Sequence, residues 1–305
     1  MAHIHLPEGA FTIFWAASWW IIAIILIAVC VFWLRKVKKI DNKTITIASL
    51  CTAAAFAIFQ VEIPIPLPLI GGVHMNLTPL IGILVGPAVG GVIVLIVNIF
   101  SAAIGHGGWG LVGANVIINM SEVLVGYFVY RALRRLNLDT FSKAGIATLL
   151  GLFVGNLVMI SIIMISGIQG VTVGSITLLN SLVIIAGVNM VAAIIEALVT
   201  GYVVAYLKKI RPDMLHETAI SQEPKQRNGN LIFGSLIVLT LILSVAVFVL
   251  PNYLGLENAI SSITEHEEHG GGILGFSIEG NLLLYVVILL VLIAVCYLVY
   301  KKFKP

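Results

Sequence analysis

The sequence predicts an all-α polytopic membrane protein with about nine transmembrane helices, an external N-terminus and a cytoplasmic C-terminus. Hydrophobic residues make up 60% of the 305-residue chain, charged residues make up only 10%, and the mean hydropathy is +1.10. This composition leaves too little polar surface to cover a water-soluble fold. Apolar runs recur along the chain, and several approach or exceed the roughly 20 residues that a bilayer-spanning helix needs. We therefore expect a multi-pass protein of the cell membrane.

The apolar runs define the expected spans in chain order. The first run is too long, and too closely followed by others, for a cleavable signal peptide. The third is short, and the paired glycines just before it allow a tight turn of the backbone. The expected spans cover residues 11–34, 45–59, 74–85, 89–104, 111–130, 145–165, 182–207, 231–250 and 282–300.

The basic residues set the expected orientation. All 17 Lys and Arg residues fall in five clusters, and threading nine spans through the membrane places every cluster on the same side. Short loops rich in Lys and Arg stay in the cytoplasm. Omitting the short third span would put the later clusters on the opposite side, so the clustering supports that span. The clusters cover residues 35–43, 131–143, 208–211, 225–227 and 301–304.

The same topology places six of the seven histidines on the external side, where seven glutamates and no Lys or Arg are expected. A surface that carries imidazoles and carboxylates without competing cations suits the capture of a divalent metal ion. The net charge of +3 then reflects topology and does not indicate a nucleic-acid partner. The external histidines are His3, His5, His74, His106, His266 and His269.

The chain begins with a metal-chelating pattern, Met1 to His5. If Met1 is removed, as the small Ala2 favours, the Ala2 amine, the His3 amide nitrogen and the His3 imidazole can close two fused chelate rings around one ion. If Met1 stays, its amine, two amides and His3 form a plane of four nitrogens. Flat nitrogen arrays favour Ni(II) or Cu(II). The alternative is an ordinary mobile terminus whose histidines bind nothing.

Two further histidines come at the outer ends of expected spans. His74 follows the paired glycines and is the natural fourth ligand for a trimmed terminus; its alternative role is a helix-end imidazole bonded to the backbone. His106 lies in the glycine-rich external segment 105–115, which runs into the next span. A structural role is favoured there, because such a loop lets the backbone pass close to neighbouring helices and the histidine can cap it.

Polar residues within the spans form a second group of candidates. Three of them recur at intervals of four and three on the fifth span, and two are seven apart on the seventh, so each set shares one helix face. Intramembrane carboxylates are costly and usually point into a bundle. We favour a structural hydrogen-bond network over a direct ion path. The group comprises Asn76, Asn115, Asn119, Glu122, Asn189 and Glu196.

Three of these motifs, in order, resemble the M components of energy-coupling-factor transporters for nickel and cobalt, the CbiM/NikM family. They are the opening His-Ile-His-Leu-Pro-Glu-Gly, the segment Gly-Gly-Val-His-Met-Asn-Leu-Thr, and the loop Gly-His-Gly-Gly-Trp-Gly-Leu-Val-Gly-Ala-Asn. The resemblance extends to about Arg211. It implies an all-helical subunit that captures its substrate at the external face.

The resemblance also implies the ligands. In that family the terminal amine, the amide and imidazole of the next histidine, and a histidine at the end of a membrane helix hold the ion in a nearly square plane. This carries over to Ala2, His3 and His74. The chain departs from the commoner Met-His-Ile-Pro opening by its extra Ala2 and by an insertion that contains His5. Auxiliary candidates are therefore Met1, His5 and His106.

A change of composition divides the chain. We expect an M-type domain of about seven helices over 1–211, a polar cytoplasmic linker over 212–230, and a two-helix module over 231–305. The external loop of that module is similar to the small N subunit, CbiN or NikN, or to the related Pro-Asp-Gly-Leu-Glu module. Its tract 265–269, rich in Glu and His, can gather metal near the capture site or be a solvated acidic loop.

The resemblance implies a non-enzymatic transporter subunit whose Ni(II) or Co(II) ion is cargo, with no organic cofactor. The sequence has no glycine-lysine phosphate loop, so separate ATPase subunits and a transmembrane coupling subunit are the expected partners. Nickel is favoured, and the nearest competing function is a cobalt-specific component serving cobalamin biosynthesis. A vitamin-capturing subunit, a non-transport structural subunit and a membrane-embedded metal-dependent hydrolase are also competing hypotheses, although the chain lacks the His-Glu-x-x-His pairing that would support the hydrolase.

Overall fold

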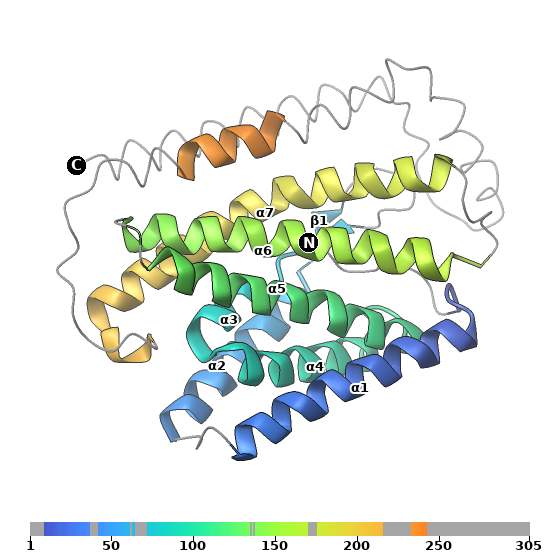
Figure 1. Ribbon diagram of the computed structural model, residues 1–305, viewed down its shortest axis with the longest axis horizontal. Coiled ribbons are helices and arrows are strands. Elements are labelled where there is room, and N and C mark those ends of the chain that lie inside the picture. The colour runs from blue at the N-terminus through green and yellow to red at the C-terminus, as the bar shows by residue number, and fades with distance from the viewer. Residues whose placement is uncertain are drawn as a thin grey trace.

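Almost all of the chain that can be described is helical (Figure 1). The computed structural model describes residues 9–36, 42–61, 63–64, 72–134, 136, 138–169, 176–215 and 233–242. The elements are α1 (Ile13–Lys36), α2 (Asn42–Phe59), β1 (Ile63–Pro64), β2 (Gly72–Val73), α3 (Thr78–Val85), α4 (Pro87–Ala103), η1 (Trp109–Leu111), α5 (Val112–Leu133), α6 (Thr140–Ser166), α7 (Ile176–Ile210) and η2 (Pro212–Met214). The two short strands pair antiparallel, with Ile63 opposite Val73.

Within these residues, 5 helices are long and apolar enough to cross a membrane: α1, α2, α5 with η1, α6, and α7 from Leu182. The apolar helices α4 and Phe233–Ile242 are shorter. α1 leaves Phe14, Ile24 and Phe32 more than half exposed, and lipid would cover such a surface. The prediction of a helical, polytopic membrane protein is confirmed. The count of nine spans stays a prediction, because 282–300 lies outside the described residues.

α5 lies at the centre of the bundle, where it contacts α1, α3, α4 and α6 (Figure 1). Glycines permit its closest approaches. A Cβ at Gly126 would lie 2.9 Å from the Cα of Pro79 on α3, and a Cβ at Gly113 would lie 2.5 Å from the backbone nitrogen of Trp20 on α1. Lipid supplies no hydrophobic driving force for helix association. Membrane helices therefore commonly associate through small residues, which let their backbones pack closely.

The third expected span is helical over only part of its length. Residues 74–77 form neither helix nor strand, Leu77 has a left-handed backbone (φ 55°), and the helix begins at Thr78. α3 then ends at Gly86, whose φ of +82° favours glycine, and Pro87 starts α4. Non-helical backbone at membrane depth is tolerated where protein buries it. The expected start of this helix at His74 is therefore wrong, for reasons given by the contacts of Asn76 below.

The described basic side chains gather at one end of the bundle, which we call the basic end. α1 and α7 finish there with basic last turns, and α5 finishes there with Arg131 and Arg134. The Lys208 Nζ on α7 donates to the Thr140 hydroxyl at the start of α6, at 3.0 Å, which joins these helix ends. The predicted orientation requires this clustering.

Candidate metal-binding site

Two histidines from separate loops meet at the end of the bundle opposite the basic end, which we call the histidine end. His74, in the non-helical segment before α3, is 2% exposed, and His106 follows the C-terminus of α4. Their ring centroids are 5.4 Å apart. Phe59, the buried last residue of α2, contacts both rings, with centroid distances of 4.2 Å to His74 and 5.2 Å to His106. α2 therefore fixes the pair from one side.

The spacing of the two rings is compatible with a shared ion. Metal–imidazole bonds of about 2.0–2.1 Å would hold the centres of two ligating rings within about 6 Å of each other. Neutral imidazole nitrogens suit nickel, cobalt and copper. Within the described residues no group of three or more His, Cys, Asp or Glu side chains could hold a metal.

Asn76 is the hub of a buried polar network that holds the His74 segment. Its backbone N–H donates to Glu196 Oε2 on α7 at 3.2 Å, and its side-chain amide donates to Glu122 Oε2 on α5 at 3.0 Å and to Asn119 Oδ1 at 3.3 Å. Both glutamates are fully buried. These contacts explain why the backbone before α3 is not helical, because they commit the Asn76 N–H to the Glu196 carboxylate.

Sequence reasoning missed two residues that complete the network. The Thr78 hydroxyl donates to the Glu122 carboxylate, and its backbone N–H donates to Asn76 Oδ1 at 3.4 Å. On α6, a Cβ added at Gly155 would lie 2.5 Å from Glu122 Cγ, so the glycine leaves room for that side chain. The only sequence signal for Thr78 is weak: a threonine at the start of a helix, two residues after an asparagine. Nothing in the sequence marks Gly155.

The other predicted polar residues lie nearby. The Asn189 amide on α7 donates to Asn156 Oδ1 on α6 at 3.0 Å, and Asn156 donates to the Leu152 carbonyl at 2.9 Å. This pair forms a second polar link between α6 and α7. Asn115 is buried one turn before Asn119 on α5. Met1, Ala2, His3 and His5, as well as the loop 265–269, lie outside the described residues.

Comparison with known proteins places these residues in a family. The family model for CbiM, the cobalt uptake substrate-specific transmembrane region, matches residues 5–214. A relative from Methanosphaerula palustris that bears the name cobalt transport protein CbiM 1 is 27% identical over 70% of this chain and 92% of its own length. A relative from Archaeoglobus fulgidus, by name a fused nickel transport protein NikMN, is 28% identical over 71% of this chain and 69% of its own.

A solved structure shows the same fold. The crystal structure of a transition metal transporter, 24% identical in sequence, superimposes with a TM-score of 0.59 over 68% of this chain and 93% of its own. The region matched by the family model contains the histidine pair and both buried glutamates. Since that match covers more than half of the 305 residues, the chain belongs to the CbiM family.

Proposed function

We propose that this protein is the substrate-binding membrane component of an ATP-driven importer of the energy-coupling-factor type, with nickel or cobalt ions as its substrate. The observation that carries the proposal is the pairing of His74 and His106 at the histidine end. Membership of the CbiM family supports a role in transport. The names of two relatives support cobalt and nickel as cargo. Nickel is our first choice, because flat nitrogen arrays suit it, and cobalt is the alternative.

In this proposal the amino terminus supplies the remaining donors: the Ala2 amine and the His3 amide and imidazole, with His74 as the fourth nitrogen. The start of the described chain supports this. The Gln169 N–H, just past α6, donates to the Ala10 carbonyl at 2.9 Å, at the same end of the bundle as the histidines. An extended chain from His3 to Ala10 can reach about 24 Å. We propose that the terminus uses this reach to meet His74.

Three other residues have subordinate roles. His106, whose ring lies beside that of His74, is proposed as an auxiliary ligand. If Met1 is retained, its amine replaces that of Ala2 and the chelate uses one more amide nitrogen. His5 is the remaining auxiliary donor.

The buried glutamates are proposed to balance the charge of the bound ion. A divalent ion bound through one deprotonated amide keeps a single positive charge, and burying an unpaired charge is costly. Glu122 and Glu196 are both fully buried, and both contact Asn76, two residues from His74. The described Lys and Arg residues all lie at the basic end, so none competes for these carboxylates. Their position therefore favours a cation at the histidine end.

The proposal places the histidine end outside the cell membrane and the basic end in the cytoplasm. There the basic end would meet the coupling subunit and, through it, the ATPase subunits. Residues 1–211 form the capture domain, 212–230 the linker and 231–305 the N-like module. The fused NikMN relative supports such a module in the same chain.

The decisive test is the chain terminus. We would measure nickel and cobalt content, and uptake in cells that contain the transporter partners, for protein with its native terminus and for protein with one added residue. The extension moves the amine out of reach of the chelate, so high-affinity binding should be abolished while membrane insertion is unchanged.

A matched control adds one residue at the carboxyl end, which should leave binding intact. If the N-terminally extended protein still binds the ion as tightly, the chelate is wrong. If uptake does not depend on the ATPase partners, the assignment to an ATP-driven importer is wrong. If the native protein supports no metal uptake at all, a hydrolase or structural role must be tested by its own activity.

A further inference from the structure

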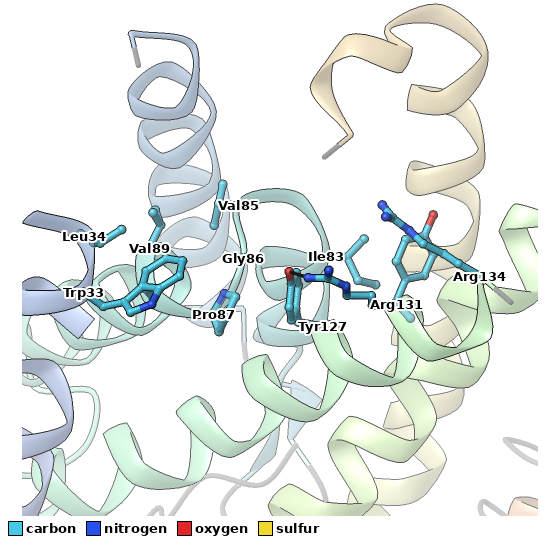
Figure 2. Close-up of a pocket in the computed structure, with 12 residues that line it drawn as sticks. Trp33, Leu34, Ile83, Val85, Gly86, Pro87, Val89, Tyr127, Arg131 and Arg134 are labelled. Atoms are coloured by element: carbon cyan, nitrogen blue, oxygen red, sulfur yellow. Dashed lines mark hydrogen bonds between the residues drawn. The ribbon is translucent and has the colours of Figure 1, made fainter. Parts of the chain in front are cut away.

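A cavity opens at the basic end of the bundle, where α1, the junction of α3 and α4, and α5 meet (Figure 2). Its volume is about 300 Å³. It adjoins Gly86 at the C-terminal end of α3, whereas the His74 segment precedes the N-terminal end of that helix. The metal site therefore does not use it.

Two arginines dominate the chemistry of the cavity. Arg131 and Arg134 are three residues apart at the end of α5, so they share a helix face, and Figure 2 shows Arg131 beside Tyr127. Arg131 Nη1 donates to the Tyr127 hydroxyl at 2.9 Å, and the Arg134 guanidinium lies 5.9 Å from the centre of the Tyr130 ring. Among the described residues that line the cavity none is acidic. The cavity therefore presents two cations and suits an anion.

The turn between α3 and α4 supplies the floor. Gly86, with its φ of +82°, ends α3, and Pro87 begins α4. Ala88 and Val89 follow in the first turn, where backbone N–H groups have no acceptor within the helix. Ala88 and Val89 both line the same cavity as the arginines.

The edge of the cavity is aromatic and apolar. Trp33, on α1, lines it and is 43% exposed, while Phe32 beside it is 64% exposed. On α5, Phe128 follows Tyr127 and is 57% exposed. Trp and Tyr at the end of a membrane helix mark the level of the lipid headgroups. A ligand here would meet cations at one end and exposed apolar side chains at the other.

We infer that this cavity binds the phosphate group of an anionic phospholipid from the leaflet at the basic end, with its acyl chains along the exposed apolar surface of α1 and α5. Guanidinium groups bind phosphate through paired hydrogen bonds. Basic pockets between membrane helices bind anionic headgroups in the same way. The combination of two arginines, a small cavity and an apolar edge matches both parts of such a lipid.

The test uses the full chain in detergent and native mass spectrometry. Phosphatidylglycerol and phosphatidylcholine with identical acyl chains would be titrated separately. We expect one phosphatidylglycerol to bind at least about tenfold more tightly than phosphatidylcholine, and R131Q/R134Q to lower that affinity about tenfold, as expected for lost charge-assisted hydrogen bonds. K36Q/K209Q, which removes two positive charges at the same end but outside the cavity, should retain the preference.

Equal affinity for the two lipids would overturn the inference, as would the same loss of phosphatidylglycerol affinity in both double variants. Displacement of the lipid by millimolar inorganic phosphate would also overturn it, because that result would indicate a site for free phosphate. Loss of coupling-subunit assembly with unchanged lipid binding would instead show a protein-docking surface. Unchanged nickel binding would show that R131Q/R134Q is folded. If that variant does not fold, R131K/R134K keeps the charge and should bind the lipid more weakly than the native chain.

Discussion

The histidine end and the basic end of the bundle differ in burial, in charge and in how their side chains are held. His74 and the two glutamates are buried, and hydrogen bonds to side chains of two helices, α5 and α7, fix the segment that carries the histidine. Arg131 and Arg134 project from one helix end beside an open cavity. A cation site inside a membrane needs ligands that the protein holds in place, because the bilayer contains no water to supply missing ligands. An anion site at the headgroup level can use long, solvated side chains.

The largest expected effect separates the two histidines. His74→Ala should lower nickel affinity by at least about 100-fold, because it removes a proposed equatorial ligand. His106→Ala, which removes only the auxiliary ligand, should lower it by about tenfold or less. Isothermal titration with nickel would measure both, with His216→Ala in the linker as the control. An equal loss in the two variants would mean that both imidazoles are principal ligands.

Acidification should affect only the histidine end. Protons compete with the ion for imidazole and amide nitrogens, so below about pH 6.5 nickel affinity should fall by about tenfold per pH unit for each competing imidazole. Arginine keeps its charge throughout this range. The lipid preference at the basic end should therefore stay constant between about pH 5 and pH 8. Titrations of nickel and of lipid at a series of pH values would measure both affinities. A nickel affinity that does not change with pH would contradict a site built from nitrogen ligands.

Removing one buried charge should give a smaller loss. Glu196→Gln keeps the shape of the side chain and an oxygen for the Asn76 N–H, but removes the proposed balancing charge. We expect nickel affinity to fall about tenfold, or about 1.4 kcal/mol. Thr200→Val, one turn further along α7 and also fully buried, changes no charge and is the matched control. Equal affinity in the Glu196→Gln variant and the native protein would show that Glu196 acts through hydrogen bonding alone.

The smallest effect concerns packing behind the network. Gly155→Ala places a methyl group against Glu122, and we expect it to destabilise the protein by about 1–3 kcal/mol and to weaken nickel binding a few-fold. A Cβ at Gly234, on the last described helix, would meet nothing within 4 Å, so Gly234→Ala is the control. Thermal unfolding in detergent would measure the difference. A Gly155→Ala variant with native stability and native nickel affinity would show that α6 can shift to accommodate the methyl group.

The long helices could be predicted from sequence because a bilayer imposes length and apolarity locally, and α1, α2 and α4 to α7 fall within a few residues of the expected spans. The segment around Asn76 could not. Its non-helical backbone depends on carboxylates from α5 and α7, which are 46 and 120 residues away in sequence. The local apolar pattern of the sequence favours a helix there, but tertiary contacts hold the backbone out of the helix.

The same distinction applies to the candidate site. Spacing predicted that Asn119 and Glu122 share a helix face, because helix periodicity is local. It could not predict that Phe59 contacts both His74 and His106, or that Gly155 admits the Glu122 side chain. Those contacts join residues from different helices, and only the packing of the bundle brings them together.

The shortness of α3 has a mechanical consequence. Its eight residues, all buried, form a rod about 12 Å long that joins the His74 segment directly to the turn at Gly86. Because so short a rod is stiff, a shift of the segment when an ion arrives would displace the Gly86 turn in the same step. α3 thus couples the position of the His74 segment to that of the Gly86 turn, which borders the cavity at the basic end.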